Sequence, residues 1–299
     1  MNNFFQEPPV YNKYIAKIMT LKDKYPFIQI FPIGESVLSR QIFALSIGNT
    51  SRVTLMAAAF HGSEWLTTTL LTKFFEDVCN SISTKQPMCD CILNSALSEK
   101  GLLVVPMVNP DGVSINLEGV ESAKYLQEFV KKISNKGYPW QANANGVDLN
   151  HNFDAGFDLL KQIEISNGIT KPSPTKYGGQ IPHSEPESRA MISLLKLYDI
   201  LSVYAFHSQG EEIYWRYGEK TPAKSKYVVK LLSDLSGYTP INDDSLNGHG
   251  GFKDYFIDNF SRPGFTIEIG KGKNPLPIEN LDEIYQKIKE MMVASILIA

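Results

Sequence analysis

The sequence has few of the features that mark disulfide-rich, membrane-spanning or nucleic-acid-binding proteins. Only three cysteines occur in 299 residues, an odd number that argues against a disulfide framework. The net charge is −3, so we expect no basic surface for nucleic acid. The longest apolar run near the end, MMVASILIA, is too short to span a membrane, which takes about 20 residues.

The chain also lacks internal repeats, and its first residues, MNNFFQEPPV, lack the basic and apolar regions of a signal peptide. We therefore expect a cytoplasmic protein with reduced thiols. Its composition, 43% hydrophobic and 20% charged, is typical of a folded globular protein.

Short apolar runs alternate with longer segments of helical periodicity. We predict strands at 41–48, 53–60, 102–108, 201–206 and 265–269, and helices at 11–24, 64–82, 121–136, 187–199, 223–237 and 280–297. This alternation predicts one α/β domain over residues 1–299, an α/β/α sandwich with a mixed central sheet. Residues 137–185 are rich in Gly, Asn, Pro and Ser, and so long a loop is expected to line a functional site.

Two of the five histidines directly follow predicted strands. His61 comes after VTLMAAAF, and His207 comes after LSVYAF. Ligands of open α/β sheets gather beyond the carboxyl ends of the strands, so this placement favours a functional site. The alternative is that each histidine is hydrogen-bonded at the edge of the core.

Glu64 strengthens the functional interpretation. It lies three residues after His61, on the first turn of the following helix, so the two side chains can converge. Two imidazoles and one carboxylate leave the fourth position of a zinc ion open for water, as in a catalytic site.

Glu268 lies in GFTIEIG, an otherwise apolar strand in which an unpaired carboxylate is costly to bury. It is either an outward-facing or paired residue, or a carboxylate beside the metal that takes a proton from water.

Five motifs follow one another along the chain: HGSEW at 61–65, NPDG at 109–112, GVDLNHNFDAGF at 146–157, HSQG at 207–210 and FTIEIG at 265–270. In order and approximate spacing they resemble the zinc carboxypeptidase family, the carboxypeptidase A-like metallopeptidases. The resemblance implies a peptidase of that fold, with one Zn²⁺ per chain.

The same resemblance implies a role for each matching residue. It makes His61, Glu64 and His207 the zinc ligands and Glu268 the general base. Asp148 matches the carboxylate that orients the first ligand histidine. Carboxypeptidase A is itself a standard example of a two-histidine, one-glutamate zinc site, so this ligand set comes from the resemblance.

Within the family, the chain is most similar to bacterial γ-D-glutamyl–diamino acid peptidases, which cut the stem peptide of peptidoglycan. Lys253 falls where family members contact the side chain beyond the scissile bond, and an ammonium there suits the additional carboxylate of diaminopimelate. The alternative for Lys253 is a surface lysine with a buried stem. The strings that carry the similarity are SEPES, HSQGEEIYW, GGFKDYFI and RPGFTIEIGKGKNPLPI.

The chain departs from the family at its substrate contacts. Asn145 and His151 stand where two arginines are usual, one for the scissile carbonyl and one for the substrate's terminal carboxylate, while Asn150 is kept. The loss of an oxyanion donor typically costs about 100- to 1000-fold in rate. The family's mobile tyrosine has no clear match, since His249 or Leu246 falls near its place.

Three interpretations remain open. The first is an active peptidase, the second a zinc-binding, weakly active or inactive protein that binds cell-wall peptides, and the third an amide hydrolase of acylated amino acids. Retention of Glu268 favours the first, and Arg189 or Arg216 is a candidate for the missing positive charge. A spore compartment is the alternative location for a cell-wall enzyme without a signal peptide.

Overall fold

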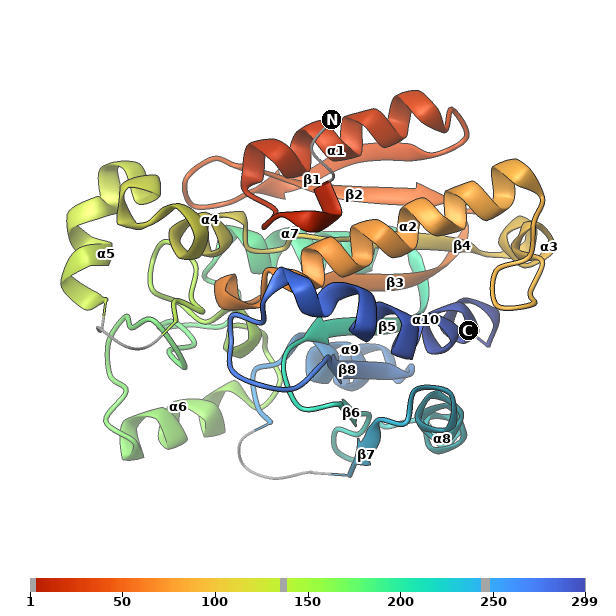
Figure 1. Cartoon of the computed structure of the whole chain (residues 1–299). Helices are drawn as coiled ribbons and strands as arrows, with labels where there is room; N and C mark the ends of the chain where they lie inside the picture. Colours follow the sequence, from red (N-terminus) through yellow and green to blue (C-terminus); the bar gives the residue numbers. More distant parts are fainter. Residues whose placement is uncertain (1–3, 135–138, 243–247, 299) are drawn as a thin grey trace.

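The strands predicted from the sequence lie in one eight-stranded sheet with the order β1-β2-β4-β3-β5-β8-β6-β7 (Figure 1). This computed structural model describes residues 4–134, 139–242 and 248–298. The strands are β1 (Gln29–Glu35), β2 (Gln41–Ile47), β3 (Arg52–Ala58), β4 (Gly101–Val105), β5 (Asp199–His207), β6 (Glu212–Tyr214), β7 (Thr239–Ile241) and β8 (Gly264–Glu268).

The sheet is mixed, as predicted, and its parallel centre positions the site. β5 pairs in parallel with β3 on one side and with β8 on the other. β1 and β2 extend one edge in antiparallel pairing, and β6 adds antiparallel to β8 on the other side. Because parallel strands share one direction, the carboxyl ends of β3, β5 and β8 meet at the same edge.

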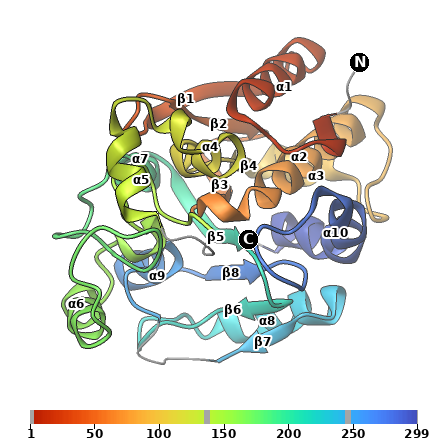
Figure 2. The same cartoon turned by 60° about the vertical axis from the view of Figure 1, so that its left-hand side comes forward.

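Helices cover both faces of the sheet, which confirms the predicted α/β/α sandwich (Figure 2). On one face lie α1 (Tyr11–Lys24), α2 (Leu66–Thr84), α8 (Lys224–Ser236) and α10 (Leu281–Leu297); on the other lie α7 (Pro186–Leu197) and α9 (Phe252–Phe260). The remaining helices are α3 (Leu93–Glu99), α4 (Pro110–Glu118), α5 (Gln127–Ile133) and α6 (Phe157–Ser166). Short 3₁₀ helices are η1 (Phe4–Gln6), η2 (Gly62–Glu64), η3 (Val120–Leu126), η4 (Leu149–His151) and η5 (Ile278–Asn280).

The central strands are apolar on both sides because both faces are covered. Along β3, Met56 and Ala58 belong to the core under α2, while Leu55 and Ala57 belong to the core under α7. This explains the nearly continuous apolar runs on which the strand predictions rest. Among the described residues, every helix is too short or too polar to span a membrane.

The helix predicted at 121–136 is wrong in part. Residues 120–126 form η3, whose Lys124 has a positive φ of 53° and breaks the helical path before α5 begins. The last two residues of the predicted helix lie outside the described part of the chain. The periodicity of apolar residues does not reveal such a break, since it depends on the backbone conformation of one residue.

Several short elements were missed. α6 lies inside the segment 137–185, which we expected to be a loop, and α4 begins within the motif NPDG. The signal for α4 is present in the sequence, because Pro110 lies in the first turn and the Asn109 side chain accepts a hydrogen bond from Gly112 N at 2.8 Å. The other missed elements are α3, α9, β1, β6 and β7.

Gly62 shows how tightly α4 packs against the turn after β3. A Cβ on Gly62 would lie 2.3 Å from the carbonyl carbon and oxygen of Gly112, closer than real atoms approach. The Gly62 N–H also donates to the Gln141 carbonyl oxygen at 2.9 Å. The glycine of HGSEW is therefore required by the close approach of α4.

We predict that Gly62→Ala destabilises the fold by about 1–3 kcal/mol, the usual cost of overpacking. The added methyl group meets backbone atoms, which cannot move aside as a side chain can. Thermal melts of the two proteins test this. Gly210→Ala is the matched control, since its Cβ would meet only the flexible side chain of Glu212, at 3.1 Å. Equal melting temperatures for Gly62→Ala and Gly210→Ala would contradict the prediction.

Candidate metal centre

The predicted site residues come together at the carboxyl ends of three neighbouring strands. His61 follows β3, His207 is the last residue of β5, and Glu268 is the last residue of β8. In the parallel register, His207 lies directly opposite Glu268. Residues separated by more than two hundred positions are thus placed at one edge of the sheet.

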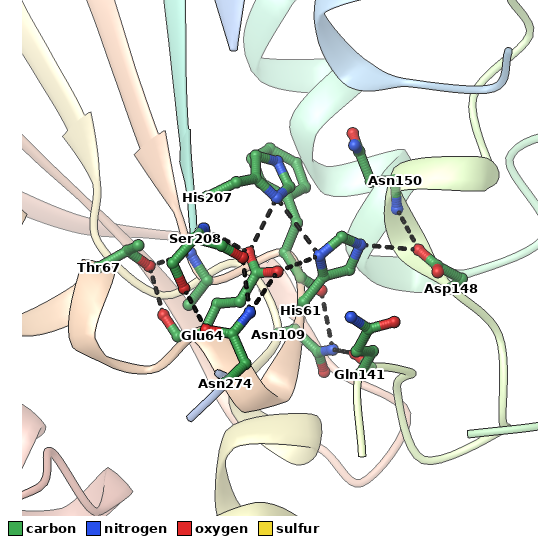
Figure 3. A network of polar contacts seen from close by, with 12 residues as sticks. His61, Glu64, Thr67, Asn109, Gln141, Asp148, Asn150, His207, Ser208 and Asn274 are labelled. Atoms are coloured by element: carbon green, nitrogen blue, oxygen red, sulfur yellow. Dashed lines mark hydrogen bonds and ion pairs between the residues drawn. The ribbon is translucent and has the colours of Figure 1, made fainter. Parts of the chain in front are cut away.

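His61, Glu64 and His207 converge on one point (Figure 3). His61 Nδ1 lies 2.9 Å from Glu64 Oε1, and His207 Nδ1 lies 3.0 Å from Glu64 Oε2. The two Nδ1 atoms are 3.3 Å apart. All three residues offer ligand atoms within 4.8 Å of one another, which confirms the predicted convergence.

The turn after β3 brings Glu64 back to His61. η2 reverses the chain, with Glu64 N donating to His61 O at 3.1 Å. Thr67 fixes this turn, because its hydroxyl donates to Glu64 O at 2.7 Å and accepts from Ala59 N at 3.0 Å. The spacing of three residues between histidine and glutamate is therefore held by main-chain and side-chain hydrogen bonds together.

The other side of His61 is held by Asp148. His61 Nε2 lies 3.0 Å from Asp148 Oδ1, and the same carboxylate accepts from Asn150 N at 3.1 Å and from Lys176 N at 3.0 Å. Burial opposes the charge on Asp148, but His61, His151 and the Lys176 N–H outweigh it and hold the pKa of that carboxyl well below its usual value. Asp148 thus lies against the ring nitrogen of His61 that faces away from Glu64, the place that an orienting carboxylate requires.

The donor set fits a metal ion. A carboxylate only accepts, so each Nδ1 facing Glu64 needs a proton, yet two N–H groups 3.3 Å apart repel each other. One divalent cation bound by both nitrogen lone pairs and by the carboxylate removes this conflict. Burial opposes a charged His61, but Glu64 and Asp148 outweigh it and raise its pKa well above the usual value, so the site favours positive charge.

Glu268 lies opposite His207 in the sheet, and its side chain has no hydrogen bond or ion pair within the described part of the chain. Burial, followed by repulsion from the carboxylate of Glu64, raises its pKa well above the usual value. A carboxylate whose pKa is shifted toward neutrality is suited to accept and return a proton.

Comparison with known proteins agrees with this geometry. The sequence profile described as zinc carboxypeptidase matches residues 14–292. The chain belongs to the zinc carboxypeptidase family. Its metal is therefore zinc, and its class is that of a hydrolase that cuts peptides.

Two curated bacterial proteins are similar over most of the chain. Gamma-D-glutamyl-L-diamino acid endopeptidase 1 of Lysinibacillus sphaericus is 37% identical over 96% of this chain and 72% of its own length. The uncharacterized protein YqgT of Bacillus subtilis is 38% identical over 91% of this chain and 72% of its own. Among solved structures, carboxypeptidase A from Helicoverpa armigera has a TM-score of 0.73 at 18% identity, covering 99% of this chain and 75% of that chain, and supports the fold.

Two of the predicted substrate contacts lie next to Asp148. Asn150 follows it by two residues, and its side-chain oxygen accepts a hydrogen bond from Phe252 N at 3.1 Å. His151 Nδ1 donates to the Lys176 carbonyl oxygen at 3.2 Å, so Nε2 is the ring atom left for a ligand. His151 also lines a cavity of about 520 Å³, together with Leu160, Ile163, Glu164, Asn167, Ile169 and Lys176.

The other three predicted contacts are held by neighbouring groups. Asn145 Nδ2 donates to Glu185 Oε2 at 2.9 Å, and His249 Nδ1 lies 3.2 Å from the Tyr217 hydroxyl. Lys253 is buried, with Nζ donating to Arg216 O at 2.9 Å and forming an ion pair with Asp254. Lys253 is therefore not the surface lysine that we considered as its alternative. Leu246 lies outside the described residues.

The sequence did not reveal several residues that hold the site. Asn109 donates through Nδ2 to Phe60 O, Gln141 O and Ala142 O at 3.0 to 3.2 Å, and so ties the end of β3 to the loop before Asp148. The NPDG motif signals its importance. Ser208 and Asn274 contact Glu64; they lie in the strings HSQG and RPGFTIEIGKGKNPLPI, to which the sequence analysis gave no such role.

Glu187 supports the loop that carries Asn145. Its side chain accepts from Val37 N at 3.2 Å and from Asn143 Nδ2 at 3.1 Å, and Asn143 Oδ1 in turn accepts from Asn145 N at 3.0 Å. Burial, followed by the nearby carboxylate of Asp111, raises the pKa of Glu187 to about 8. Glu187 is therefore protonated in the folded protein at neutral pH.

We predict that His207→Ala abolishes stable zinc binding, because it removes one of three converging ligands. Elemental analysis should find one zinc per chain in the unaltered protein and little in the variant. His183→Ala is the matched control, since His183 accepts a hydrogen bond from Asp154 N and lies outside the cluster. Equal zinc content in His207→Ala and the unaltered protein would contradict this ligand assignment.

We predict that Glu187 makes the fold less stable as pH rises. Its pKa is raised from 4.5 to about 8, so the folded state holds a proton that the unfolded state has lost between these values. Stability therefore declines from pH 4.5 to about 8, and Glu187→Gln should flatten that decline. Thermal melts between about pH 5 and 9 measure the slope. Glu164→Gln, at a buried carboxylate paired with Lys161, is the control; equal slopes in all three proteins would reject the prediction.

Proposed function

We propose that the protein hydrolyses the amide bond between γ-D-glutamate and a diamino acid in the stem peptides of peptidoglycan. The observation that carries this proposal is the 37% identity, over 96% of the chain, with the Lysinibacillus protein named gamma-D-glutamyl-L-diamino acid endopeptidase 1. The convergence of His61, Glu64 and His207 supports it, because a relative without these side chains would lack the metal site.

In this proposal His61, Glu64 and His207 hold the zinc ion, which supplies Lewis-acid polarisation of the scissile carbonyl and of water. Glu268 accepts a proton from the attacking water on a carboxylate oxygen. As the C–N bond breaks, Glu268 returns that proton to the leaving amine, so the products are a carboxylic acid and a free amine. Asp148 keeps His61 oriented throughout.

Recognition of the substrate rests on groups that already have partners. A diaminopimelate carboxylate that approaches Lys253 competes with Asp254 for the ammonium, so the ammonium is shared between the substrate and Asp254. The Nδ1–H of His151 is used by Lys176 O, so its neutral ring offers only an acceptor at Nε2.

A second candidate function is that of a zinc-binding protein with weak or no activity that binds cell-wall peptides. The hydrogen bond from Asn145 Nδ2 to Glu185 favours it, because the amide that replaces the family's carbonyl-polarising arginine is directed at a carboxylate of the protein itself. Glu268 favours the hydrolase, since a protein that only binds peptides has no use for a general base.

The test is to incubate the zinc-loaded protein with stem tri- and tetrapeptides and to identify the products by mass spectrometry. We predict cleavage after γ-D-glutamate, and a loss of about 100- to 10,000-fold in rate for Glu268→Gln, the usual contribution of a general base. Glu76→Gln, at a carboxylate on α2 that pairs with Lys17, is the control and should retain hydrolysis.

The outcomes separate the two candidate functions. Binding of stem peptides without cleavage by the zinc-loaded protein would favour the second function. Undiminished hydrolysis by Glu268→Gln would reject the role of this residue while leaving the substrate assignment intact.

A further inference from the structure

The metal-facing carboxylate of Glu64 is held by two segments that are far from it in the sequence. One segment follows β5 and contains Ser208; the other follows β8 and contains Asn274. Ser208 N donates to Glu64 Oε2 at 3.2 Å, and Asn274 Nδ2 donates to Glu64 Oε1 at 3.4 Å. Each oxygen of the carboxylate thus receives one hydrogen bond from a residue outside the metal cluster.

Asn274 and Ser208 also bind each other at two points (Figure 3). Asn274 Nδ2 donates to Ser208 O at 2.6 Å, and the Ser208 hydroxyl donates to Asn274 Oδ1 at 2.7 Å. Both polar atoms of the Asn274 side chain are therefore in use, which fixes the direction of its amide. The amide nitrogen is turned toward Glu64 and Ser208 O, and only that orientation satisfies every contact.

These two donors become more important once a metal is bound. His61 and His207 would hold the ion through their Nδ1 lone pairs and would then no longer donate to Glu64. The Glu64 side chain is only 4% exposed, so water cannot replace them freely. Among the described residues, the hydrogen-bond donors to the Glu64 side-chain oxygens that then remain are Ser208 N and Asn274 Nδ2.

We propose that Asn274 is a positioning residue that orients Glu64 for zinc and thereby sets the affinity of the site. Asn274 is not itself a ligand, since its Oδ1 accepts the Ser208 hydroxyl and its amide nitrogen has no lone pair to offer a metal. It acts through the carboxylate, in the way that partners of ligating side chains generally tune metal sites.

A simpler role is that Asn274 only ties the two loops together. The structure provides separate ties for that purpose, because Gly272 N donates to Gln209 Oε1 at 3.2 Å and Gly210 N donates to Gly270 O at 2.9 Å. Gln209 thus joins the same two loops without contacting Glu64, which makes it a matched control. If zinc binding depends only on the tie between the two loops, replacing either Asn274 or Gln209 should weaken it. If it depends on the orientation of the Glu64 carboxylate, only replacement of Asn274 should weaken it.

The experiment measures the dissociation constant of zinc by competition with a chelator for Asn274→Ala, Gln209→Ala and the unaltered protein. It also compares melting temperatures with and without zinc. We expect Asn274→Ala to weaken zinc binding by about 10- to 100-fold and to reduce the zinc-induced rise in melting temperature. Gln209→Ala should bind zinc as tightly as the unaltered protein.

Asn274→Leu serves as a second variant, because leucine keeps the approximate shape of asparagine without its polar atoms. It should weaken zinc binding as Asn274→Ala does, which shows that the loss comes from the amide. Unchanged zinc affinity in both Asn274 variants would overturn the proposal. So would an equal loss in Gln209→Ala, since that result would assign the effect to the loops as a whole.

Discussion

The parallel pairing of β5 with β3 and β8 is the constraint on which the rest of the site depends. Parallel strands end at the same edge, so the residues that terminate these three strands must lie side by side. His207 and Glu268 end β5 and β8, and His61 follows the end of β3 by three residues. The helices on both faces bury the apolar side chains of the strands, and in doing so they hold the three strand ends in register.

At this edge the protein places three carboxyl groups around two imidazole rings. Glu64 lies between His61 and His207, Asp148 holds the far side of His61, and Glu268 stands beside them without a partner in the described chain. Such an arrangement is costly to bury without a cation. A zinc ion offsets this cost, and the surrounding hydrogen bonds fix the orientation of each ligand.

The features that depended on nearby residues were predictable from the sequence. The strands were visible as apolar runs, and His61 and Glu64 share one turn, so their convergence follows from local geometry. The break at Lys124 and the three-residue strands β6 and β7 were not visible, because one backbone angle or a strand of three residues leaves little periodic signal. Lys253 lies on α9, a helix that the sequence analysis missed, and its ion pair with Asp254 was not foreseen.

The sequence by itself determined the order of the five central strands and of most of the longer helices, the family, and the types of side chain that follow the strands. Only the tertiary structure decided which groups these side chains contact. Asn145 donates to Glu185, forty positions away, and Asn274 reaches Glu64 across two hundred and ten. A hydrogen bond depends on the distance and direction of two atoms, and for residues so far apart in the chain these are set by how the segments pack.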